Sequence, residues 1–152
     1  MGVEDLPRPR GRPGATHRQW SADPQVLADV RRTVGTWLHA LGIASELCED
    51  LVYATSEAAS NAVEHAYRSA ASTGTVAIAM WVETGAVNIE IADRGCWLPV
   101  SAYPTSRGHG LQLIRGLVES VDIASSSSGT TVSLRHSVPG LSSRQVEPAR
   151  GG

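Results

Sequence analysis

A carboxylate and an amide stand four residues apart in the segment Glu57-Ala-Ala-Ser-Asn61. In a helix, side chains at this separation lie one turn apart on the same face, and Glu64 and His65 extend that polar face by another turn. Asn disfavours helix interiors, so its place here requires an explanation. The segment alone allows two interpretations equally, a solvated polar stripe and a catalytic or binding face.

A second polar group follows an alternating apolar segment, where Ile91-Ala-Asp93-Arg-Gly95 brings an Asp to a glycine turn. A carboxyl group in this place can accept a hydrogen bond from an amine, and Gly95 allows a ligand to approach the backbone closely. An ordinary turn at the end of a strand has the same sequence. This motif alone does not decide between a ligand site and an ordinary turn.

Two glycine motifs complete the set of residues suited to chemistry. The segment Arg107-Gly108-His109-Gly110-Leu111 stands directly before an apolar helical pattern, and backbone N–H groups that open a helix can hold phosphate, with Arg107 as a charged donor. Its spacing matches neither a Walker nor a Rossmann motif, and a tight turn explains it equally. Gly129-Thr130 opens the last apolar alternation and by itself indicates a hairpin exit.

The elements that must position these residues follow from the period of the apolar side chains. A helical period predicts three helices, over 23–41, 45–67 and 111–119. Gly42 is expected to end the first of them. Alternation of apolar and other residues predicts four strands, over 76–82, 87–91, 121–124 and 131–136. The first two are expected to form a hairpin. A short edge strand is expected over 16–20, and a loop without periodicity over 93–107.

The order of the elements groups helices and antiparallel strands instead of alternating them strictly. This order predicts an α+β fold, a two-layer α/β sandwich in which helices cover one face of a mostly antiparallel sheet. We expect one domain over 15–136. A disordered basic tail over 1–14 and a second disordered tail over 137–152 are expected around it, because both ends are rich in Pro, Gly, Ser or Arg.

Composition excludes several classes of function. The chain of 152 residues has a net charge of -2, so no overall field favours nucleic acid or an anionic membrane, and no apolar run is long enough to span a bilayer. Cys48 and Cys96 form no Cys-x-x-Cys pair, and the five histidines have no metal-ligand spacing. These features predict a cytoplasmic protein without a zinc site or a disulfide framework.

Taken together, the four motifs stand in the order found in the GHKL ATPase superfamily, which has the Bergerat, or histidine-kinase-like ATPase, fold. Glu-x3-Asn on a helix, Asp-x-Gly after a strand, Gly-x-Gly before a helix and a late Gly-Thr resemble its motifs. The compact domain and the wording from Ser56 to Tyr67 resemble the RsbW and SpoIIAB branch of anti-sigma serine/threonine kinases. The resemblance covers residues 23–136.

This resemblance implies roles for four residues along the helix and the strands. Asn61 would bind the Mg²⁺ ion that bridges the phosphates of ATP, and Glu57 would be the general base for an attacking hydroxyl. Asp93 would accept a hydrogen bond from the adenine amino group, assisted by a water and by Thr130. A carboxylate and a metal ligand one turn apart agree with the needs of phosphoryl transfer, which depends on positioning and charge neutralisation.

The glycine motifs have implied roles as well. Gly95 would let the base lie close to the backbone, the backbone of 108–111 would hold phosphates, and Arg107 would reach the terminal one. Residues 98–106 would form the ATP lid. His65 and His109 lie within these motifs, as local residues of the nucleotide site or of its packing.

The resemblance implies an anti-sigma factor that sequesters a sigma factor and phosphorylates a STAS-domain anti-anti-sigma protein. A homodimer belongs to the same expectation, with the first helix and the nearby strand as the partner and dimer surface. Arg31 and Arg32 are then candidates for partner contacts, and an ordinary solvated helix face explains them equally.

Trp97 departs from the family's first glycine box, which has Gly at that position, and the lid is short. Both departures bear on catalysis more than on nucleotide binding. They leave open a second function, an ATP-binding anti-sigma or switch module with little or no phosphate transfer. A third alternative is an α+β interaction domain whose motifs are coincidental.

Overall fold

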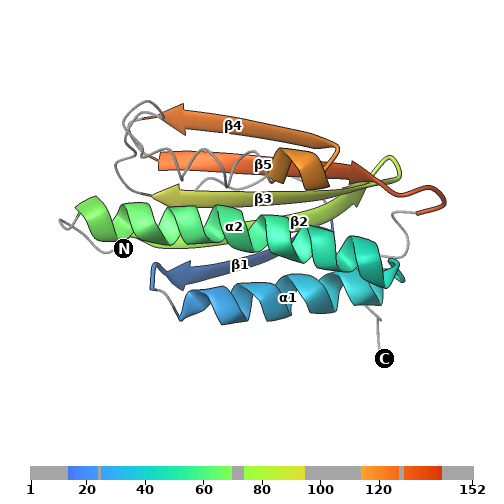
Figure 1. Ribbon diagram of the computed structural model, residues 1–152, viewed down its shortest axis with the longest axis horizontal. Coiled ribbons are helices and arrows are strands. Elements are labelled where there is room, and N and C mark those ends of the chain that lie inside the picture. The colour runs from blue at the N-terminus through green and yellow to red at the C-terminus, as the bar shows by residue number, and fades with distance from the viewer. Residues whose placement is uncertain (1–13, 24, 70–73, 95–113, 127–128, 142–152) are drawn as a thin grey trace.

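The computed structural model describes residues 14–23, 25–69, 74–94, 114–126 and 129–141 of the chain (Figure 1). The elements follow in chain order as β1 (Thr16–Ser21), α1 (Val26–Ala40), α2 (Ser45–Ser69), β2 (Thr75–Glu83), β3 (Ala86–Arg94), β4 (Ser120–Ser126) and β5 (Gly129–Ser137). Residues 114–117, just before β4, are helical as well. Among these residues, no helix is both long and apolar enough to cross a bilayer.

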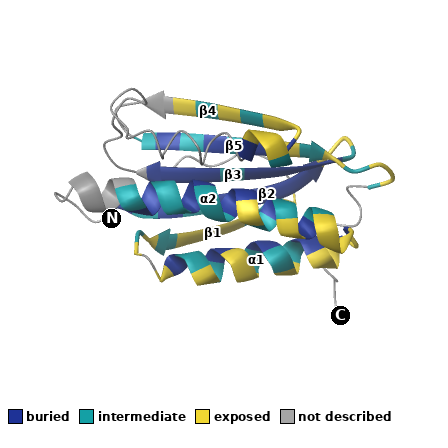
Figure 2. Ribbon diagram, in the orientation of Figure 1, coloured by how far each residue is buried: buried dark blue, intermediate teal, exposed yellow. Residues whose placement is uncertain are grey.

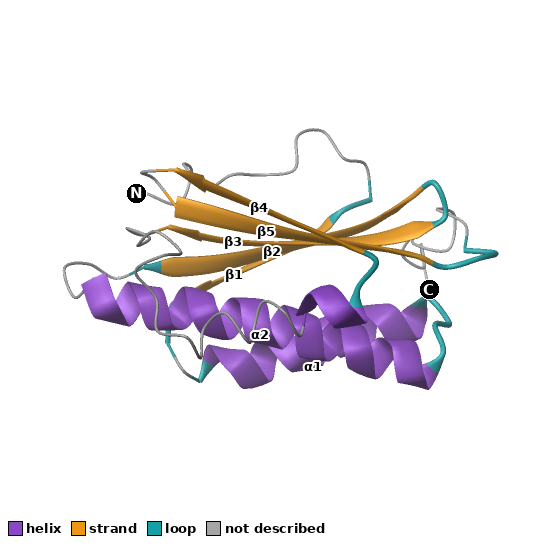
Figure 3. Ribbon diagram, turned by 45° about the horizontal axis from the view of Figure 1, so that its top comes forward, coloured by secondary structure: helices purple, strands orange, loops and turns teal. Residues whose placement is uncertain are grey.

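The five strands form one antiparallel sheet in the order β1-β2-β3-β5-β4. Both α1 and α2 lie on the same face of this sheet, as the turned view shows (Figure 3). The predicted two-layer α+β sandwich is therefore confirmed. The short strand expected at the edge is β1, which pairs only with β2.

Helix α1 packs through a narrow apolar stripe. Asp23 precedes it and its Oδ1 accepts a hydrogen bond from the backbone N–H of Gln25 at 2.9 Å. The residues that recur at helical spacing are buried, and they are Val26, Val30, Val34 and Leu38. Gly42 then takes a φ of +77°, a conformation that favours glycine, and turns the chain toward α2.

Helix α2 has a wider buried face made mostly of small side chains, namely Leu51, Ala54, Thr55, Ala58, Ala59, Ala62 and Val63. Alanines on this face let the helix backbone approach β2 and β3, on which α2 packs. The one hydroxyl among them is satisfied, because Thr55 Oγ1 donates to the carbonyl of Leu51 at 2.8 Å. The polar residues at 57, 61 and 64 consequently fall on the flank of the helix.

The β2–β3 hairpin closes through Thr84 and Gly85, whose φ angles are +50° and +72°. Two positive φ values are the signature of a type I′ turn, whose twist matches that of the flanking strands. The turn fixes the register in which Val76 pairs with Asp93. Asp93 and Arg94 thus belong to β3, whereas the sequence predicted a loop from residue 93, because ladder pairing with β2 continues past the last apolar residue.

The segment after β5 is tied to the hairpin turn. Val138 N–H donates to the carbonyl of Gly85 at 2.9 Å, and Leu141 N–H donates to the carbonyl of Val138 at 3.0 Å. Both side chains pack against the core cluster. Residues 138–141, which the sequence assigned to the C-terminal tail, therefore contribute to the fold.

Glu119 links the helical residues 114–117 to the end of β5. Its Oε1 accepts a hydrogen bond from the backbone N–H of Ser137 at 3.1 Å, and its own N–H donates to His136 Nδ1 at 3.2 Å. The hydrogen bond from Ser137 lowers the pKa of the Glu119 carboxyl group, and the nearby His136 and Arg135 lower it further. The ionised form of Glu119 is thus favoured in the folded protein.

We expect Glu119→Gln to lower the melting temperature at pH 7 and to leave it unchanged near pH 3. A lowered folded pKa stabilises the fold above the unfolded pKa, and this stabilisation disappears as pH falls through the folded pKa. Thermal unfolding of both proteins across this range measures the difference. Equal differences in melting temperature at both pH values would contradict the assignment.

Candidate functional site

Asp93 and Thr130 lie side by side on the adjacent strands β3 and β5. They are register partners in the β3–β5 ladder, and their exposed fractions are 5% and 2%. By strand alternation both side chains belong to the same face of the sheet as Ile91 and Val132, which is the face that the helices cover. The structure therefore brings together two of the residues that the sequence predicted for adenine recognition.

Glu57 and Asn61 lie on the flank of α2, and both are half-buried. Glu64 continues this flank and is half-buried too. The half of α2 that contains these residues lies at the same end of the sheet as the end of β3 and the start of β5 (Figures 1 and 3). The polar flank of α2 and the Asp93–Thr130 pair thus belong to one end of the molecule.

The remaining predicted site residues lie outside the described part of the chain, and they are Gly95, Arg107, Gly108, His109, Gly110 and Leu111. Trp97 and the expected lid over 98–106 lie outside it as well. His65 belongs to α2, but its side chain is not described. Their roles stay predictions.

Two of the described side chains fit the predicted roles toward Mg²⁺ and ATP. The side-chain carbonyl of Asn61 is a hard oxygen ligand, and Mg²⁺ typically takes only one or two protein ligands and completes its shell with phosphates and water. The described residues contain no cluster of three or more His, Cys, Asp or Glu side chains that could hold a metal ion. Within this part of the chain there is therefore no metal site made of such side chains alone. Asp93 supplies a buried acceptor for an amino group.

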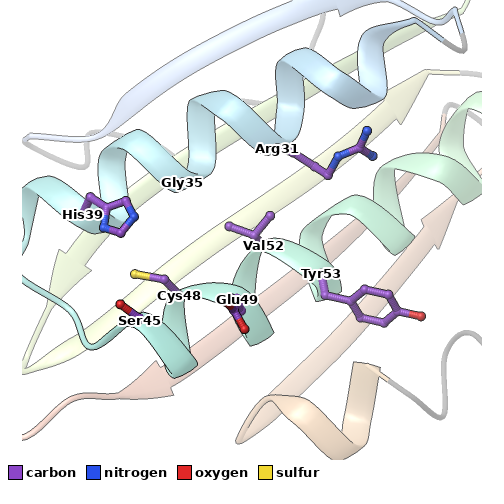
Figure 4. Close-up of a pocket in the computed structure, with 8 residues that line it drawn as sticks. All are labelled: Arg31, Gly35, His39, Ser45, Cys48, Glu49, Val52 and Tyr53. Carbon is purple, nitrogen blue, oxygen red and sulfur yellow. The ribbon is translucent and has the colours of Figure 1, made fainter.

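A separate groove of about 410 Å³ lies between α1 and α2 (Figure 4). Arg31, Gly35 and His39 line it from α1 at successive turns, and α2 contributes residues that include Cys48 and Tyr53. Tyr53 is the exposed large apolar residue of the described chain, at 44%. This groove contains neither Glu57 nor Asn61, so it is distinct from the predicted nucleotide site. In the sequence, only the spacing of 31, 35 and 39 around a glycine on one face of the first helix indicates such a feature.

Cys48 lines this groove with a buried side chain. Burial raises the pKa of the Cys48 thiol, and the neighbouring Glu49 carboxylate raises it further. The thiol also donates a hydrogen bond to the carbonyl of Ile43 at 3.4 Å. Its role is therefore packing beside the groove.

The two arginines predicted as partner contacts have different surroundings. Arg31 lines the groove, and its Nη1 donates to Ser56 Oγ at 3.2 Å. Arg32 instead forms an exposed ion pair with Asp29 at 2.9 Å, one turn earlier on α1. Arg31 therefore presents its charge at a concave surface, whereas Arg32 belongs to a solvated helix face.

Comparison with known proteins agrees with this arrangement. Residues 20–136 match the family of histidine kinase-like ATPase domains. The serine-protein kinase RsbW of Bacillus pumilus is 30% identical over 74% of this chain and 79% of its own length. The serine-protein kinase RsbW of Bacillus licheniformis is 35% identical over 49% of this chain. That match covers 46% of the relative, so the matched part spans about half of its length.

A solved structure has the same fold. The crystal structure of the RsbU and RsbW domains of a Mycobacterium tuberculosis protein superposes with a TM-score of 0.66 at 30% identity. The match covers 81% of this chain and 32% of the other. By this family match and by its likeness to the RsbW kinases, the chain belongs to the histidine kinase-like ATPase family, in its RsbW-type branch.

Proposed function

We propose that this protein is an anti-sigma factor that uses ATP to phosphorylate a serine or threonine of a STAS-domain partner. The observation that carries the proposal is the buried pairing of Asp93 with Thr130 at the end of the sheet where the half of α2 with Glu57 and Asn61 also lies. This arrangement provides an acceptor for the adenine amino group at one place and an acid–base group beside a metal ligand at another. Membership of the RsbW-type branch supports the same function.

The proposed chemistry assigns a task to each described residue. Asn61 holds Mg²⁺ through its amide oxygen, and the ion neutralises phosphate charge when it is bound. Glu57 accepts the proton of the partner's hydroxyl as that oxygen bonds to the terminal phosphorus of ATP, and the bond from this phosphorus to ADP breaks. Asp93 and Thr130 fix the base and thereby the position of the phosphates. The expected roles of Gly95, Arg107, Gly108, His109, Gly110 and Leu111 in holding the nucleotide complete the proposal.

An ATP-binding switch module without efficient phosphate transfer is the second candidate, because Trp97 replaces the last glycine of the first glycine box. Transfer of labelled phosphate from ATP to a co-expressed STAS protein separates the two functions. Incorporation into the STAS protein that depends on Mg²⁺ supports the kinase. Binding of Mg–ATP with no transfer would favour the switch module and overturn the kinase.

The groove between α1 and α2 is our proposed contact surface for the sigma factor. Its concave shape, the exposed Tyr53 and the cation of Arg31 fit a helix that presents an apolar anchor and a carboxylate. Since a sigma factor acts in transcription, the proposal places the protein in the cytoplasm. A homodimer remains part of the proposal.

We expect Arg31→Glu to weaken binding of the proposed sigma-factor partner at least about tenfold, because an arginine that becomes buried at the centre of an interface can contribute about 1.4 kcal/mol or more. Arg32→Glu is the matched control on the next residue of α1, and its effect should stay within about threefold. Titration by fluorescence anisotropy measures both. Equal weakening by the two variants would indicate general electrostatic attraction and contradict the groove as the contact surface.

A further inference from the structure

Gly35 stands in the middle of α1, where the described fold does not require a glycine. A glycine in a helix interior is unfavourable relative to alanine, and Gly35 has no positive φ that would demand it. Close packing does not demand it either. Among the described atoms, a Cβ at residue 35 would meet only Val52 Cγ2, at an ordinary contact distance of 3.8 Å. Neither backbone conformation nor packing within the described chain therefore explains the missing side chain.

The space that this glycine leaves open belongs to the groove between α1 and α2. Gly35 lines the groove together with Val52 and the exposed Tyr53 (Figure 4). Exposed and half-buried residues follow the outward side of both helices (Figure 2). A glycine next to a valine, with a tyrosine on the same groove, makes a hollow with apolar walls. Such a hollow suits an apolar side chain that comes from a partner.

The two ends of the groove have opposite charges. Arg31 lines one end, where its Nη1 donates to Ser56 Oγ at 3.2 Å. Glu49 lines the groove from a position on α2 two turns before Ser56, which corresponds to roughly 10 Å along the helix. Burial and the Glu49 carboxylate together raise the pKa of the Cys48 thiol, so the negative charge acts at the groove wall.

Both charges are available to a partner. Within the described part of the chain, Arg31 contacts a neutral hydroxyl, and neither Arg31 nor Glu49 forms an ion pair. Arg32, the next residue of α1, is instead paired with Asp29 at 2.9 Å. A cation at one end of the groove and an anion at the other favour an occupant whose charges have the opposite order.

We propose that the groove receives one amphipathic helix, which places an apolar anchor over Gly35, a carboxylate at Arg31 and a cation at Glu49. This inference rests on the proposed function of the groove as the sigma-factor contact surface, and it specifies the chemistry of the helix that binds there. Two charges about two turns apart on one helix face are about seven residues apart in sequence, and the anchor lies between them. Helices dock into grooves through such a face.

Gly35→Ala distinguishes a binding role of this glycine from a structural one. Alanine favours the helix and meets no close contact among the described atoms, so the melting temperature should rise. The added methyl group fills the hollow and should weaken binding of the helix at least about fivefold. Gly116→Ala is the matched control in the helical residues before β4, where a Cβ would meet no described atom within 4 Å. It should leave binding unchanged.

Three fluorescein-labelled helical peptides serve as probes for titration of the full chain by fluorescence anisotropy. Each has a central leucine between two charged residues about seven positions apart, which are glutamate and lysine, two glutamates, or two lysines. We expect the mixed peptide to bind at least about fivefold more tightly than either like-charged peptide. Glu49→Lys should transfer the preference to the peptide with two glutamates, and Arg31→Glu to the peptide with two lysines.

Equal affinity for the three peptides, or full affinity in Gly35→Ala, would overturn the proposal. Absence of binding by all three would overturn it as well, and self-association of the chain that Gly35→Ala weakens would then assign the groove to a second copy. Neither a sigma factor nor ATP enters this titration. Its failure is therefore distinct from failure of the proposed function, which sigma-factor binding and phosphate transfer measure separately.

Discussion

Glu57→Gln is expected to lower the rate of phosphate transfer to the STAS partner at least about 100-fold, because general base catalysis typically contributes a factor of 10² to 10⁴. The glutamine keeps the size and the hydrogen-bonding geometry of the side chain but cannot take up the proton. Glu57 lies on the flank of α2 and is half-buried, so the substitution leaves the packed face of the helix untouched.

Binding of Mg–ATP separates a catalytic effect of Glu57→Gln from a structural one. The dissociation constant should change by less than about threefold, since a group that acts only in the transition state alters the rate and not ground-state binding. Glu46→Gln, in the exposed first turn of α2, is the matched control and should transfer phosphate at the rate of the unmodified protein. Undiminished transfer by Glu57→Gln would show that another group is the base.

Asp93→Asn is expected to raise the dissociation constant for ATP about 100-fold. A hydrogen bond to a charged group contributes roughly 2 to 3 kcal/mol, and its loss corresponds to a change of this size. The carboxyl group lies 5% exposed between its ladder partners, where water cannot replace it easily. The asparagine keeps one acceptor oxygen, but it lacks the negative charge and has an NH₂ donor in place of the second oxygen.

Two further variants make this result specific. Thr130→Val removes the neighbouring hydroxyl and should weaken ATP binding about tenfold or less, because one neutral hydrogen bond contributes about 1 kcal/mol. Asp122→Asn, exposed on β4, should leave the affinity unchanged. ATP binding by Asp93→Asn at the affinity of the unmodified protein, with an unchanged melting temperature, would exclude Asp93 from base recognition.

The helices and the hairpin could be predicted from the sequence because their signals are local. The stripe of Val26, Val30, Val34 and Leu38 has the helical period, and the Thr84-Gly85 turn is a local hairpin signal. For the same reason the sequence predicts that Glu57 and Asn61 share one face of a helix, and both belong to α2.

The pairing of strands could not be predicted in this way. Chain order would place β4 next to β3, but β5 occupies that position. The reason is burial: Thr130, Val132 and Leu134 of β5 are buried between two neighbours, while β4 exposes Ser120, Asp122 and Ala124 at the edge. The contact of Asp93 with Thr130 depends on this long-range choice, and no local pattern specifies it.

Two other features escaped prediction because they arise between elements. The groove at Arg31 and Tyr53 depends on how α1 and α2 pack side by side, and the burial of Trp81 at 5% exposure depends on the folded sheet. The hydrophobic period of a single element does not contain either piece of information. Both are properties of the folded chain.

Calorimetric titration of the unmodified protein with Mg–ATP and with Mg–GTP tests the central claim most directly. The account predicts one site for ATP with a dissociation constant below about 1 mM. It also predicts at least tenfold weaker binding of GTP, because guanine places a carbonyl acceptor where adenine has the amino donor that Asp93 recognises. Absence of ATP binding up to millimolar concentration, or equal affinity for the two nucleotides, would contradict it.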